Sequence, residues 1–137
     1  MQKAAKYLEQ IQKNKIRIAQ LNAQYNEIEE RMVWLRGIDY SKDRVQTSVS
    51  NVLPAQVAAA IDEQNHLAEQ MKQLGAEIYH RIQQIQGMDK PYHADLLFAQ
   101  YVKGMSLKDL AAEIGLSYGY VRQIKGEALQ AFEEKYL

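Results

Sequence analysis

A chain of 137 residues is long enough for one compact domain, or for a small domain joined to an extended element. Its 17 basic and 17 acidic side chains cancel, and the absence of cysteine excludes disulfides and cysteine-based zinc or redox sites. No apolar stretch approaches the roughly 18–20 residues needed to cross a bilayer, and the charged start of the chain lacks the apolar core of a signal peptide. We therefore expect a cytoplasmic protein that does not contact membranes.

The composition favours an all-α fold. Two prolines and seven glycines leave little room for long loops, and residues with high helix propensity are frequent. The segment from Ala4 to Leu35 has the pattern of a long amphipathic helix, although Lys15 and Asn22 interrupt its apolar face. Gly37 is placed to end this helix. The apolar residues that repeat every seven positions are Ala4, Ile11, Ile18, Tyr25 and Met32.

A polar stretch, IDYSKDRVQTSVSN, follows this helix and predicts a loop over residues 37–53. The residues Asp39–Ser50 in it fit either a polar connector that caps the flanking helices or a loop that contacts a partner. Pro54 fits the first turn of a second long helix that reaches Gln86. The apolar stripe of this second helix consists of Val57, Ile61, Leu67, Met71, Leu74, Ile78, Ile82 and Ile85.

Charge favours pairing between these two helices. Residues 1–36 carry a net charge of +3, and residues 54–86 carry a net charge of −2. Long helices with a single apolar stripe need a partner face. We therefore predict that residues 1–87 form an antiparallel, coiled-coil-like helical hairpin. The same stripes could also pair between two chains, so the hairpin is a candidate for homo-oligomerisation or for docking to another protein.

The sequence pattern of residues 88–137 predicts three helices. Asp89 and Pro91 can open the first of them, and Gly104 can end it. Ser106 with Asp109 gives a capping-box pattern for a short helix that ends near Ile114. Gly115-Leu116-Ser117 then predicts a tight turn, after which Ser117 caps a last helix that runs toward Tyr136.

The last two helices have the pattern of a helix-turn-helix. Ala111 is the small residue expected at their crossing, and Gly115 suits the turn. We expect Leu116, Val121 and Ile124 to pack against Leu110 and Ile114. The front of the last helix would then expose five residues where such modules meet the base edges of double-stranded DNA, namely Ser117, Tyr118, Gly119, Arg122 and Gln123.

The side chains at this front suit the contacts that DNA requires. Arg122 can pair with guanine and Gln123 with adenine, while Lys108 and Lys125 suit phosphates. Glycines inside a helix cost about 1 kcal/mol each relative to alanine, and close approach of the backbone to DNA is one reason to keep Gly119. The alternative without a role in DNA binding is an amphipathic helix whose charged side chains only face solvent.

The stretch SLKDLAAEIGLSYGYVRQIKGEAL resembles the helix-turn-helix of region four in bacterial primary sigma factors, which reads a promoter element. The run Val121-Arg122-Gln123-Ile124 and the pair Ala128-Leu129 match that pattern. The resemblance implies that Tyr118, Gly119, Arg122 and Gln123 face bases. Tyr118-Gly119-Tyr120 stands where sigma factors usually have charged residues, so promoter preference does not carry over. Nothing here resembles the sigma region that melts DNA.

A second resemblance covers most of the chain. Two long helices flanking the phrase DYSKDRVQTSVSN, followed by a sigma-like helix-turn-helix, resemble small phage and prophage regulators of the ArpU/RinA type. This resemblance implies an activator of late phage genes that acts at a promoter with RNA polymerase in the bacterial host cell. The alternative is a DNA-packaging protein similar to a small terminase subunit, although in that class the helix-turn-helix is usually N-terminal.

The sequence gives no sign of an enzyme. His66, His80 and His93 are scattered, and neither a zinc-protease signature, a nucleophile elbow nor a phosphate loop is present. Glu63 and His66 lie one turn apart, but such pairs are common on solvated helix faces. We therefore expect no catalytic residues, no metal and no cofactor.

Overall fold

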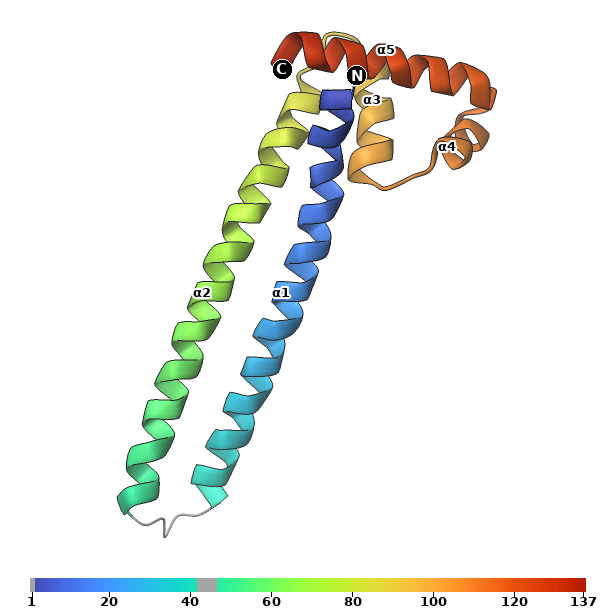
Figure 1. The fold of residues 1–137 in the computed structure, drawn as a ribbon. Coiled ribbons are helices and arrows are strands. Elements are labelled where there is room, and N and C mark those ends of the chain that lie inside the picture. The colour runs from blue at the N-terminus through green and yellow to red at the C-terminus, as the bar shows by residue number, and fades with distance from the viewer. Residues whose placement is uncertain (1, 42–46) are drawn as a thin grey trace. The chain divides into compact units, whose positions relative to one another are not determined.

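The computed structural model of the chain describes residues 2–41 and 47–137, and these residues are helical nearly throughout, with no strand among them (Figure 1). The predicted all-α fold is confirmed. No helix within these two ranges is long and apolar enough to cross a membrane. The elements in chain order are α1 (Gln2–Ser41), α2 (Thr47–Gln86), α3 (Pro91–Leu97), the π-helix η1 (Phe98–Val102), α4 (Leu107–Ile114) and α5 (Tyr118–Tyr136).

Both long helices extend further into the predicted loop than the sequence suggested. Gly37 does not end α1, which continues to Ser41, and Pro54 lies inside α2, which begins at Thr47. A single glycine costs a helix only about 1 kcal/mol. A proline inside a helix costs more, about 3 kcal/mol, because it has no N–H to donate to the preceding turn, although its fixed φ suits the helix that follows it. Both residues therefore permit a helix boundary without enforcing one. Residues 42–46 of the predicted loop lie outside the described residues.

The chain divides into two compact units, and both long helices contribute to each of them. The first unit contains Met1–Ile16 and Gly75–Leu137, and the second contains Arg17–Leu74. In the second unit, α1 and α2 run antiparallel, as the predicted hairpin requires (Figure 1). Its core is formed by Leu21, Ile28 and Leu67.

The stripe of α2 departs from expectation in this second unit. Ile61 is 40% exposed, whereas the polar Gln64 is buried. The Gln64 amide donates a hydrogen bond of 2.9 Å to the Glu29 carboxylate and a longer one of 3.4 Å to the Tyr25 carbonyl. A buried amide is tolerated because both interactions satisfy it. Gln64 thus joins α2 to α1 by polar contacts.

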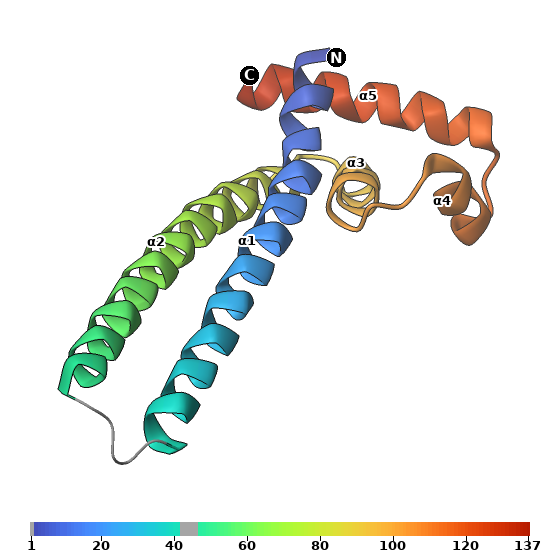
Figure 2. The same cartoon turned by 60° about the horizontal axis from the view of Figure 1, so that its bottom comes forward.

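In the first unit, residues from the start of α1 and the end of α2 share one hydrophobic cluster with residues of α3, η1, α4 and α5. Figure 2 shows the first turns of α1 lying against α5. The Tyr7 and Phe132 rings are 5.8 Å apart, and the Tyr7 hydroxyl donates to Gln84 at 2.5 Å. Burial of such aromatic and aliphatic surface is the main stabilising contribution here. Fully buried side chains of this core include Leu8, Ile11, Ile85, Leu97, Val121 and Phe132.

Residues of α1 also satisfy the carbonyls at the end of η1. The Gln12 amide donates to the carbonyls of Tyr101 and Val102 at 2.9 and 3.0 Å, and the Lys15 ammonium donates to the Val102 carbonyl. Carbonyls at the end of a helix lack partners within the helix, and they favour a nearby cation. Lys15 interrupts the apolar face of α1 because it binds this helix end.

The start of α3 differs from the prediction in one residue. Pro91 occupies the first turn as expected, but the N-cap residue is Lys90 and no side chain caps the helix. Asp89 instead accepts a hydrogen bond of 2.8 Å from the Lys135 ammonium, which also donates to the Gly87 carbonyl at 2.6 Å. The pairing holds the pKa of Asp89 below its usual value. Asp89 and Lys135 therefore join the α2–α3 turn to the end of α5.

Candidate nucleic-acid interface

The turn between α4 and α5 has the local geometry that the sequence predicts. The Ser106 hydroxyl accepts from the Asp109 amide at 3.1 Å, and the Ser117 hydroxyl accepts from the Tyr120 amide at 3.2 Å. Gly115 ends α4 with a φ of +74°, a left-handed conformation that favours glycine. Two capped helices joined by a three-residue turn are the backbone of a helix-turn-helix.

Packing between α4 and α5 only partly follows the prediction. Leu110, Ala111 and Val121 are buried between the helices as expected. Ile114 and Leu116, however, are 50% and 42% exposed, so they do not lock α5 onto α4. Together with Leu110 and Ile124 they line an open cavity of about 220 Å³, which leaves much of each side chain exposed. The prediction that they are core residues is wrong.

Most of the predicted DNA-facing residues are exposed. Ser117 is the N-cap of α5, Tyr118 and Gly119 lie on its first turn, and Arg122 and Gln123 follow one turn later. Lys108 of α4 is exposed as well, whereas Lys125 is half-buried. An alanine side chain at Gly119 would meet nothing within 4 Å, so no packing requires a glycine there. The start of α5 is therefore accessible to a large ligand.

Tyr118 brings two of the predicted cations together. The Arg122 guanidinium lies 5.7 Å from the centre of the Tyr118 ring, and the Lys108 ammonium lies 5.9 Å from it. Cation–π contacts at exposed positions contribute about 0.5–1 kcal/mol, which is enough to favour one orientation of a long side chain. The cluster Lys108–Tyr118–Arg122 thus presents two positive charges from two helices around one aromatic ring.

A cavity of about 640 Å³ lies beside this cluster and includes a third cation. Tyr118, Arg122 and Lys125 line it from α5, and Gln2 and Ala5 line it from α1. Sequence patterns did not indicate that α1 forms part of this surface, because the contact joins residues far apart in the chain. Gln123 is exposed but does not line the cavity.

Lys125 is positioned by a buried tyrosine. Its ammonium lies 5.9 Å from the centre of the Tyr101 ring, which belongs to η1 and is only 5% exposed. Burial, with a smaller contribution from the charge of Glu9, raises the pKa of Tyr101 to about 12. Tyr101 therefore stays neutral and offers its ring face to Lys125 under ordinary conditions.

Charge is divided along α5, although the chain as a whole is neutral. The residues 117–126 contain Arg122 and Lys125 and no acidic side chain, whereas the residues after them contain Glu127, Glu133 and Glu134. The first half of α5 is therefore positive even though the net charge of the whole chain is zero. Positive charge at the exposed start of such a helix is suited to phosphates.

The comparisons with known proteins agree with the helix-turn-helix geometry of α4 and α5. Residues 79–134 match the model of a family described as a helix-turn-helix domain. The matched segment runs from the end of α2 through nearly all of α5. Neither a curated protein nor a solved structure matches the chain. Residues 79–134 thus contain a helix-turn-helix domain, which indicates sequence-specific DNA binding.

Proposed function

We propose that this protein is a sequence-specific regulator of transcription whose helix α5 enters the major groove of DNA. The observation that carries the proposal is the cluster Lys108–Tyr118–Arg122 at the exposed start of α5. In helix-turn-helix modules this position meets base edges, while nearby cations meet phosphates. Arg122 would pair with guanine and Gln123 with adenine, whereas Lys108 and Lys125 would bind phosphates.

We further propose that it acts as a phage or prophage activator of late genes, at a promoter and together with RNA polymerase. The support for this role is the resemblance to sigma region four and to the ArpU/RinA regulators. It would act in the cytoplasm of the bacterial host, without catalytic activity of its own. The run Val121-Arg122-Gln123-Ile124 carries the resemblance on the helix proposed to read DNA.

Self-association through the second unit would compensate for a weakly charged DNA-binding module. Affinity for DNA grows with the number of phosphates neutralised, and one module offers few cations. Joining two modules raises their effective concentration at paired sites. The second unit offers apolar surface for such pairing, since Val33 and Trp34 are 60% and 66% exposed.

The role at a promoter is tested by mapping bound sites and RNA polymerase occupancy in the native host, with and without the protein. The proposal expects discrete sites near late promoters and a loss of polymerase at those promoters when the protein is absent. Bound sites without any change in polymerase occupancy would contradict a role in transcription. Binding confined to a packaging site would instead favour the terminase-like alternative.

The role of the second unit is tested by replacing residues 17–74 with a short glycine-rich linker. The ends are close enough for this, because the Asn14 amide donates to the Glu77 carboxylate at 3.0 Å. With the helical content of the variant checked by circular dichroism, we expect weaker DNA binding and a shallower salt dependence than for the full chain. Equal affinity and equal salt dependence would show that the second unit does not increase the affinity for DNA.

A further inference from the structure

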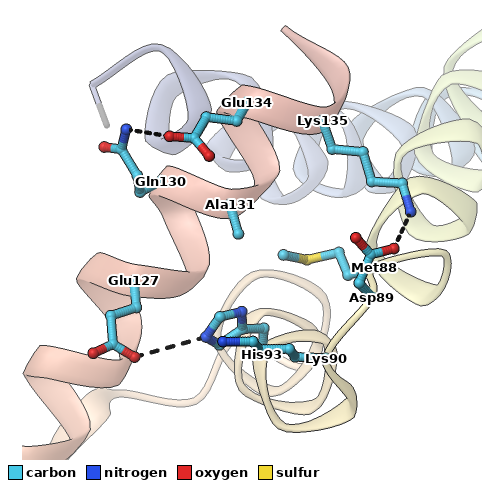
Figure 3. A pocket seen from close by; sticks show the side chains of 9 residues that line it. All are labelled: Met88, Asp89, Lys90, His93, Glu127, Gln130, Ala131, Glu134 and Lys135. Atoms are coloured by element: carbon cyan, nitrogen blue, oxygen red, sulfur yellow. Dashed lines mark hydrogen bonds and ion pairs between the residues drawn. The ribbon is translucent and has the colours of Figure 1, made fainter.

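A cavity of about 400 Å³ lies on the face of α5 that carries Glu127, between that helix and the start of α3. Its volume falls within the range of small-molecule sites, which is about 300–1,000 Å³. Figure 3 shows charged side chains around it and the apolar side chains of Met88 and Ala131 in its lining. The cavity is lined by residues other than those proposed to contact DNA.

His93 supplies an unsatisfied polar atom in this cavity. The residue is 4% exposed, and its Nε2 atom makes no hydrogen bond. The Glu127 carboxylate approaches this atom without bonding to it, because its Oε2 atom lies 3.8 Å from Nε2, beyond hydrogen-bond range (Figure 3). A buried nitrogen without a partner costs free energy, so a group that bonds both atoms would be stabilised here.

The charges around the cavity favour a cationic ligand. Lys135 is already paired with Asp89, which neutralises both side chains. Lys90 lies with its ammonium 5.9 Å from the centre of the Tyr92 ring. Among the described residues, Glu134 accepts only from the neutral amide of Gln130, at 2.9 Å.

Glu127, like Glu134, has no lysine or arginine as an ion-pair partner among the described residues. Within the described part of the chain, its one ion-pair partner is His93, which carries charge only when protonated. Two carboxylates on the α5 side of the cavity thus lack a permanent cationic partner. A positively charged group inside the cavity would be attracted to both of them.

We propose that this cavity binds a small organic cation, a guanidine or primary amine carried on a short aliphatic chain. The ligand head donates hydrogen bonds to His93 Nε2 and to the Glu127 carboxylate, for which the neutral imidazole carries its proton on Nδ1. The aliphatic chain lies against Met88 and Ala131. Such a ligand would bridge α3 and α5, and the proposal does not depend on DNA binding.

The test compares three probes that share a butyl chain: butylguanidine, butanol and butyrate. Calorimetric titration of the full chain should give saturable binding of butylguanidine, with the neutral and anionic probes bound at least about tenfold more weakly. The ¹⁵N signal of His93 Nε2 should shift when butylguanidine is added. Equal binding of all three probes, or tightest binding of butyrate, would overturn the proposal.

Two variants locate the site. Glu127→Gln should weaken butylguanidine binding about tenfold to a hundredfold, because a charge-assisted hydrogen bond is lost. Glu113→Gln removes the same charge from the exposed surface of α4 and should leave binding unchanged. Equal effects of the two variants would show a general attraction to acidic surface. A His93 ring that is already protonated without ligand, and whose signals do not respond to butylguanidine, would also overturn the proposal.

Discussion

The Arg122 guanidinium lies 5.7 Å from the centre of the Tyr118 ring, one helical turn away on the exposed start of α5. The contact restricts a flexible side chain in the protein without DNA. Preorganisation of this kind lowers the entropy lost on binding. It also makes the role of Arg122 testable apart from that of the lysines around it.

Arg122→Ala is expected to cost about 1–3 kcal/mol of binding free energy at the cognate site, and much less on unrelated duplexes. Gel-shift or anisotropy titrations on both kinds of DNA measure the difference. The control is Lys108→Ala, which should weaken both kinds of binding and reduce the salt slope by about one. Equal losses on specific and random DNA for Arg122→Ala would mean that Arg122 contacts phosphate only.

Gly119→Ala separates helix stability from DNA binding. Because nothing lies within 4 Å of the added methyl group, the substitution should raise the free energy of unfolding by up to about 1 kcal/mol. If DNA approaches the backbone here, specific affinity should fall at the same time. The control Gly75→Ala in α2 is equally open and should only stabilise. Unchanged DNA affinity for Gly119→Ala would place Gly119 outside the interface.

Tyr101 predicts a loss of stability at high pH. Its pKa rises from 10.0 to about 12 on folding, so between these values the unfolded chain releases a proton that the folded chain retains. The free energy of unfolding should therefore fall as the pH rises through this range. Tyr101→Phe should show a smaller fall in denaturant titrations at the same pH values. Identical pH profiles for both proteins would contradict the assignment.

Trp34 reports on self-association because it is the single tryptophan of the chain and is 66% exposed. If the second unit pairs between chains, Trp34 emission should move to shorter wavelength as protein concentration rises. Trp34→Lys should then lower the mass measured by light scattering. Tyr79→Lys changes a comparably exposed side chain in the first unit and should not affect the mass. A monomeric mass at all concentrations would contradict pairing.

Local rules predicted the helix-turn-helix well. Ser106 and Ser117 cap the helices that their positions indicate, and Gly115 has the left-handed conformation that ends α4. These features depend on neighbouring residues alone, so the sequence contains them in full. The stripe of the first hairpin helix was predicted for the same reason, since helical periodicity placed Ile11 and Met32 on its buried side.

Features that depend on distant residues could not be predicted. Lys15 interrupts the predicted apolar face of α1, yet it binds the Val102 carbonyl at the end of η1. Nothing near Lys15 in the sequence indicates a helix end 87 residues away. Asp89 was expected to cap α3 and instead pairs with Lys135, because an ion pair across the fold competes with a local cap. The predicted domain boundary at residue 87 stays a prediction. One hydrophobic cluster includes residues from both sides of that boundary.

In our proposal, α5 reads a DNA sequence. This role is tested by selecting bound duplexes from a random pool with the purified full chain and sequencing them. We predict that the natural protein enriches one discrete motif that contains a guanine. The Arg122→Ala variant should lose the preference for guanine at that position. A pool that shows no enrichment, or one whose motif is unchanged by Arg122→Ala and Gln123→Ala together, would contradict the proposed role of α5.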